Sequence, residues 1–218
     1  MQRSLLYVTS ILTATAALLL AGCGSSTESS KGDDQITGAD QDQTTVTSSP
    51  SVNASGATER PKITLPSDVE NLFANWKTGD RTKDRLLADV KERINATDAA
   101  IVTGDPNSEA LTFYYKGEAL AGAAEWVQGY VNDGKSITGT VRFFNPDLVM
   151  ADEDTAALAY CADESKAFDK NRKSNKAEKS PATKDSYVAY NTRAQKTEQG
   201  VWQTTSLLSD RGNAKCAP

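Results

Sequence analysis

The sequence predicts an α+β domain in which N-terminal helices pack on a curved antiparallel sheet. Two observations lead to this fold class. In the first half of residues 63–218, apolar side chains recur at helical spacing, and in the second half they alternate with polar ones. Helices followed by strands that turn back on one another are typical of α+β folds. The span is long enough for one ordinary core, so we expect a single domain.

Three helices are expected before the strands. Ser67 and Glu70 have the spacing of a capping box, and an apolar stripe follows at Val69, Leu72, Phe73 and Trp76. We expect Gly79 to end this helix and Asp80 to cap a second one, whose stripe extends to Ile101.

The third helix is expected to begin at Asp105 and Pro106, which suit the N-cap and the first helical position. It should continue to the turn at 132–134, with Gly117 as a candidate kink.

Strands are predicted where apolar and polar residues alternate, beginning with residues 137–143. Asn145-Pro146-Asp147 should bend or bulge the chain. The expected hairpins pair 148–151 with 155–162 and 186–193 with 200–209.

The first 23 residues form an export signal. An apolar stretch, Leu5–Leu20, follows Arg3 and is shorter than the ~20 residues of a comfortable membrane span. Leu20-Ala21-Gly22-Cys23 comes next and resembles the lipobox of bacterial lipoproteins. The resemblance implies a lipoprotein signal peptide over 1–22, lipid on Cys23, and anchoring at the extracytoplasmic face of the cell membrane.

A polar segment separates this signal from the domain. Residues 23–62 comprise the lipidated cysteine and a stretch rich in Ser, Thr, Gly, Asp and Gln. Such a composition buries too little apolar surface to offset its ordering entropy, so we predict a disordered tether. The expected organisation is therefore 1–22 signal peptide, 23–62 tether and 63–218 domain.

Cysteine usage agrees with an exported domain. Once Cys23 is assigned to lipid, Cys161 and Cys216 remain, and two cysteines outside the cytoplasm most simply form a disulfide. The alternative is a pair of buried free thiols.

Composition excludes several function classes. The chain has no His, so it holds neither a His-based triad nor a His-ligated metal site. Its net charge of -5 argues against a nucleic-acid partner. The Asp105, Asn107 and Glu109 spacing lacks the glycine of a calcium loop, and no glycine-rich phosphate loop is present. We predict neither a metal nor a cofactor.

The order of the expected elements is similar to that of the nuclear transport factor 2-like cone. The lipobox, residues 124–127, 136–139 and 200–202, and Cys216 also make the chain look like a group of Gram-positive surface lipoproteins of unassigned function. The cone resemblance implies a pocket between sheet and helices, which some members use as isomerases or dehydratases and others for binding or assembly. No catalytic motif of those enzymes matches here, so no catalytic residue is assigned.

Aromatic residues are the candidates for lining such a pocket, because rings with hydroxyl groups suit an apolar ligand. The alternative is that they fill the core. The candidates are Tyr115, Trp126, Tyr130, Phe143, Tyr160, Tyr187 and Trp202.

A basic loop is expected over 164–185. Bases outnumber acids there, and a loop of this length is uncommon in a compact domain. It is either a solvated loop or an arm that contacts anionic cell-wall polymer or lipid headgroups. Its candidate contacts are Lys166, Lys170, Arg172, Lys173, Lys176 and Lys179.

These observations favour a non-catalytic, lipid-anchored binding module for a small apolar ligand or an envelope protein partner. An isomerase- or dehydratase-type enzyme that uses a buried Asp and a Tyr is the second interpretation. A homodimeric assembly protein is the third.

Overall fold

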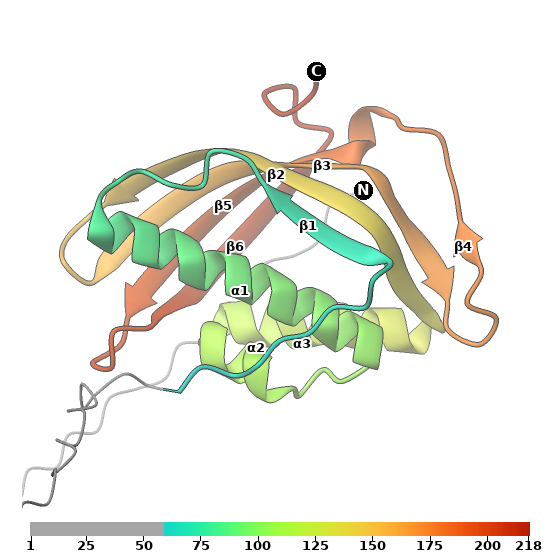
Figure 1. Ribbon diagram of the computed structural model, residues 1–218, viewed down its shortest axis with the longest axis horizontal. Helices are drawn as coiled ribbons and strands as arrows, with labels where there is room; N and C mark the ends of the chain where they lie inside the picture. Colours follow the sequence, from blue (N-terminus) through green and yellow to red (C-terminus); the bar gives the residue numbers. More distant parts are fainter. Residues whose placement is uncertain (1–58) are drawn as a thin grey trace, which may run out of the picture. The chain divides into compact units, whose positions relative to one another are not determined.

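The structure is a computed structural model, and it describes residues 59–218 (Figure 1). The signal peptide, Cys23 and most of the predicted tether lie outside the described residues. The elements are β1 Val69–Phe73, α1 Arg81–Thr103, α2 Glu109–Tyr114, α3 Glu118–Asn132, β2 Lys135–Met150, β3 Thr155–Asn171, β4 Ala177–Glu178, the 3-10 turn η1 Lys184–Ser186, β5 Tyr187–Lys196 and β6 Trp202–Arg211.

A single curved sheet covers the three helices on one side (Figure 1). Its strand order is β1-β2-β3-β5-β6, with β4 paired to β3. All neighbours are antiparallel except β1 and β2, which are parallel. The predicted α+β class, with helices on a curved sheet, is confirmed, but the sheet is mixed rather than wholly antiparallel.

The prediction of a first helix is wrong, because Val69–Phe73 forms an edge strand. Its residues alternate: Asn71 and Phe73 contact α1, while Glu70 and Leu72 are exposed. A segment this short nucleates a helix poorly in water, whereas the ladder with β2 satisfies its backbone groups. The apolar residues that suggested a helical stripe fit this alternation only in part.

The second helix forms as predicted. Asp80 is the N-cap of α1, and its side chain accepts a hydrogen bond from the Lys83 amide at 2.9 Å. The helix ends at Gly104, whose positive φ of 75° suits glycine.

The segment that was predicted to form the third helix forms two helices, α2 and α3. Ser108, rather than Asp105, caps α2, and Asp105 instead accepts from the Asn107 amide in a turn. The chain leaves helical geometry at Tyr115, whose backbone forms a parallel bridge to Thr204 of β6. Gly117, with a φ of 61°, then opens α3. This interruption matters for the site, because it turns the Tyr115 side chain into the interior.

The predicted bulge and hairpins are present. Register shifts between Phe144 and Asp147, where Asn145 has a φ of 51°. The predicted loop over 164–185 is shorter than expected, because β3 continues to Asn171 and pairs there with Lys135. An ion pair between Lys135 and Asp169, with Nζ and Oδ2 2.8 Å apart, favours this extension of the ladder.

The core consists mainly of two apolar clusters between the helices and the sheet. The first joins the N-terminal half of α1 to β2, β3, β5 and β6 and includes Trp76, Phe143, Tyr160 and Trp202. The second joins α2 and α3 to the end of α1 and includes Tyr115 and Val127. No helix within residues 59–218 has the length and apolar character needed to span a membrane.

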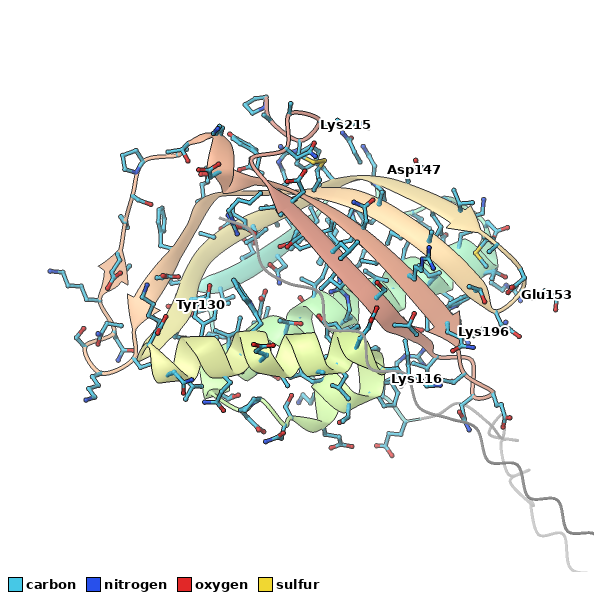
Figure 2. The ribbon with its side chains drawn as sticks, turned by 180° about the vertical axis from the view of Figure 1, so that it is seen from behind. Lys116, Tyr130, Asp147, Glu153, Lys196 and Lys215 are labelled. Atoms are coloured by element: carbon cyan, nitrogen blue, oxygen red, sulfur yellow. A yellow bond between two sulfur atoms is a disulfide. The ribbon has the colours of Figure 1, made fainter. Side chains whose placement is uncertain are left out.

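The predicted disulfide between Cys161 and Cys216 is confirmed. It ties the C-terminal tail to the middle of β3. Figure 2 shows this tail, with Lys215, on the side of the sheet away from the helices.

Candidate functional site

Polar side chains meet in the interior where the two apolar clusters adjoin. They come from β1, α1, the C-cap of α2, α3, β3, β5 and β6, with the half-exposed Arg211 at the rim, and we call them the interior polar cluster. Its members are Asn71, Arg93, Thr97, Asp98, Tyr115, Tyr130, Tyr160, Glu164, Tyr190 and Arg211.

Arg93 bridges the two apolar clusters. Its two terminal nitrogens donate to the hydroxyl oxygens of Tyr115 at 2.9 Å and Tyr160 at 2.6 Å. The Tyr115 oxygen also lies 2.8 Å from the Thr97 hydroxyl. Arg93 is only 3% exposed, its Nε has no partner, and no carboxylate within residues 59–218 lies at ion-pair distance. A fully charged guanidinium is therefore buried with neutral hydroxyl groups as its hydrogen-bond partners.

Asp98 lies beside Arg93 on α1 and is partly buried. Burial raises its pKa to about 6, nearby Glu164 adds to the rise, and an Asn71 hydrogen bond and Arg93 oppose it. The Asn71 amide donates to Asp98 at 2.6 Å and to Asn95 at 3.1 Å, while the Asn71 Oδ1 atom is buried without a partner. The carboxyl group is thus half-protonated near pH 6.

Glu164 anchors the side of the cluster formed by β3, β5 and β6. It accepts from Arg211 at 2.7 Å and from the Tyr190 hydroxyl at 3.4 Å. The Tyr190 ring stacks on Tyr160 with centroids 5.1 Å apart. Burial raises the pKa of Tyr190 well above its ordinary value, so the hydroxyl stays protonated. Asp98, Glu164 and Tyr190 all retain partial exposure, so solvent reaches the cluster.

The predicted pocket aromatics differ in exposure: some are buried, some are half-buried and one is exposed. Tyr115, Phe143, Tyr160 and Trp202 are buried at 6% exposure or less, and of these Tyr115 and Tyr160 belong to the polar cluster. Tyr130 is half-buried and lies between α3 and the strands (Figure 2). Tyr187 is half-buried at the start of β5.

Trp126 does not lie in the interior. It is 55% exposed on α3 and packs edge-on against Tyr130.

Arg93, Asp98 and Asn71 were not predicted as site residues. One sequence signal could have found the first: Arg93 follows Leu86 by seven residues and Val90 by three, so a charge occupies the apolar stripe of α1. Asn71 carried no such signal, because its segment was expected to be helical.

The predicted basic contacts are divided between structural pairs and free surface. Lys170 pairs with Asp68 at 2.7 Å, and Arg172 donates to the carbonyls of Ile101 and Val102 at the end of α1. The exposed ones are Lys166, Lys173, Lys176 and Lys179.

A groove of about 430 Å³ lies outside the sheet–helix interior. It runs between residues 61–64, the C-terminal half of α1 and the start of α2. None of the predicted pocket aromatics lines it.

Comparisons with known proteins return structural likenesses only. No family model matches the sequence, and no curated protein matches it. The intermembrane space region of chloroplast protein ARC6 is 13% identical, with 62% of this chain and 98% of that one covered and a TM-score of 0.42. Aln2 from a Streptomyces species is 15% identical, with 62% and 94% covered and a TM-score of 0.41. Hexachlorocyclohexane dehydrochlorinase LinA-type3 from Novosphingobium barchaimii is 12% identical, with 58% and 86% covered and a TM-score of 0.38.

Proposed function

We propose that this chain is a binding protein, held at the extracytoplasmic face of the membrane by lipid on Cys23, whose interior polar cluster receives a small ligand. The observation that carries the proposal is the set of buried polar atoms without partners in the described part of the chain. Arg93 Nε, Asn71 Oδ1 and Trp76 Nε1 belong to this set.

Such atoms are costly when no hydrogen bond satisfies them. A buried donor or acceptor without a hydrogen bond costs about 1–3 kcal/mol, and a charged one costs more. Trp76 packs edge-on against Tyr160 with ring centroids 5.2 Å apart, and Arg93 donates to the Tyr160 hydroxyl, so two side chains that each carry an unpartnered donor contact Tyr160. A ligand with acceptor groups offsets the cost of both.

Native mass spectrometry of the full chain, purified in mild detergent from its own host, tests the proposal. We expect a copurified small molecule that is lost on denaturation, and an intact mass that shows lipid on a chain beginning at Cys23. A Val149→Ala chain is the matched control, because this exposed side chain on β2 is not a member of the cluster and its truncation should leave the ligand bound.

A repeatedly unliganded wild-type chain would contradict the binding proposal. A chain that keeps residues 1–22 or carries no lipid would contradict the anchor instead, so the same measurement separates the two parts.

A proton-transfer enzyme is a second candidate function, and Asp98 is the observation that favours it. A carboxyl group with a pKa of about 6 close to tyrosine hydroxyls is suited to general acid–base catalysis. A released molecule that is converted by the wild-type chain but not by Asp98→Asn would favour this candidate.

A further inference from the structure

Resting on the proposed function, we infer that the ligand is a small monocarboxylic acid with an aromatic or apolar body, and that its carboxylate supplies the counter-charge that Arg93 lacks.

Arg93 carries a buried positive charge that no carboxylate pairs with. Its hydrogen-bond partners are the neutral hydroxyls of Tyr115 and Tyr160, and its Nε is unpartnered at 3% exposure. Removing a charge from water without a paired counter-charge costs several kcal/mol. A guanidinium presents a planar fork that matches carboxylate geometry, so a carboxylate is the natural partner.

The neighbouring acids do not form an ion pair with Arg93. Glu164 is already bound by Arg211 at 2.7 Å and by the Tyr190 hydroxyl. Asp98 makes its 2.6 Å contact with Asn71, and because of its raised pKa it is largely neutral below pH 6. Arg93 therefore has no carboxylate at ion-pair distance in the described part of the chain, and Asp98, which is ionised above about pH 6, offsets its charge only from farther away.

The charged groups around Arg93 restrict the ligand to a single negative charge. The ionisable groups that interact with the Arg93 charge are Asp98 on α1, Tyr115 after α2, Tyr160 on β3 and Tyr190 on β5, and beyond them lie Glu164 of β3, Arg211 of β6 and Tyr130 of α3. No lysine belongs to the cluster. One free guanidinium next to two acids favours a monoanion over a phosphate dianion.

Aromatic rings near Arg93 favour an aromatic or apolar body for the ligand. Tyr160 packs against Trp76 at 5.2 Å and stacks on Tyr190 at 5.1 Å, and the Arg93 guanidinium lies 5.3 Å from the Tyr115 ring centre. Rings thus border the charged group from several elements. An aromatic or apolar body gains hydrophobic and ring contacts there, whereas a sugar would lose hydration.

Isothermal titration of the full chain in neutral detergent tests the inference with three probes. Sodium benzoate carries both features, benzamide has the same shape without the charge, and inorganic phosphate is an anion without the body. We expect benzoate to bind at least about tenfold more tightly than benzamide, which forms no charge-assisted hydrogen bond, and than phosphate, which gains no ring contacts.

Variants assign the effect to Arg93. Arg93→Met should abolish the preference for benzoate over benzamide, whereas Arg193→Met, at an exposed position on β5, should preserve it. Asp98→Asn should tighten benzoate binding several-fold at pH 7.5, because it removes a negative charge near Arg93. If Arg93→Met does not fold, the Asp98→Asn result and the benzamide comparison decide the question.

The outcomes separate the two proposals. Equal affinity for benzoate and benzamide, or a neutral copurified molecule, would overturn the carboxylate inference while leaving the binding function in place. An acidic copurified molecule supports the inference even where benzoate is too small to bind. If no probe binds and nothing copurifies, the proposed function itself fails.

Discussion

Asp98 carries an energetic penalty that a single substitution should relieve. The carboxyl group is partly buried, and its pKa is raised to about 6 from 3.8, so folding favours its protonated form. An acid with a raised pKa contributes most to stability below its unfolded pKa, and this contribution is lost as pH rises through its folded pKa. The penalty is therefore absent below about pH 4 and complete above about pH 6.

Asp98→Asn should therefore stabilise the chain at neutral pH. The variant should exceed wild type in free energy of unfolding by about 3 kcal/mol more at pH 7.5 than at pH 3.5, as a shift of about two pKa units implies. Urea denaturation of both chains across this range measures the difference. A constant difference between the two proteins at every pH would contradict the raised pKa.

Arg172 should behave differently from its lysine neighbours in the basic segment. Its guanidinium donates to the Ile101 and Val102 carbonyls, which are among the last of α1 and lack helical partners. Arg172→Gln should lower the free energy of unfolding by about 1–2 kcal/mol. Lys173→Gln, one residue on and exposed, should change it by less than about 0.5 kcal/mol. Equal effects in urea denaturation would show that Arg172 does not stabilise the helix end.

The exposed lysines of the segment between β3 and β5 are the ones expected to contact anionic surfaces. A chain that begins at Gly24, and so lacks both the apolar signal peptide and the lipid site, should cosediment with phosphatidylglycerol vesicles. Replacing Lys173, Lys176 and Lys179 with Gln should weaken this binding by about 1 kcal/mol per lysine.

The matched control for vesicle binding replaces exposed lysines elsewhere, at Lys77, Lys116 and Lys215. If both triple variants lose binding equally, the segment has no special role and overall charge explains the attraction.

Local signals predicted the elements whose partners are close in sequence. The Asp80 cap and the stripe of α1, and the alternation of β5 and β6, are complete within one segment. β1 was missed because its ladder partner begins about 70 residues later, at Gly139, and nothing in Val69–Phe73 reveals that pairing.

The same reason explains why the candidate site was predicted only in part. Tyr115 and Tyr160 were predicted as pocket residues from their residue type. Their contact with Arg93 was not predicted, because it depends on how three elements distant in sequence pack together.

The disulfide should act on the whole molecule rather than on one element. Cys161 and Cys216 are 55 residues apart and connect the middle of the sheet to the C-terminal tail. A Cys161→Ala/Cys216→Ala chain should lose about 2–4 kcal/mol of unfolding free energy, because the unfolded chain regains freedom. Urea denaturation with and without reductant checks this, since reduced wild type should match the double variant. Unchanged stability on reduction would contradict the prediction.

The buried carboxylate of Asp89 determines where the domain would resist a mechanical load. It is 2% exposed and binds both the Arg60 guanidinium, at 2.8 Å, and the Trp202 amide, at 2.9 Å. A pull applied to the chain ahead of Arg60 would therefore be met first where α1 adjoins β6, before it reaches the edge strand β1. The five-residue parallel ladder of β1 is thus shielded from unzipping for as long as the Arg60–Asp89 pair holds.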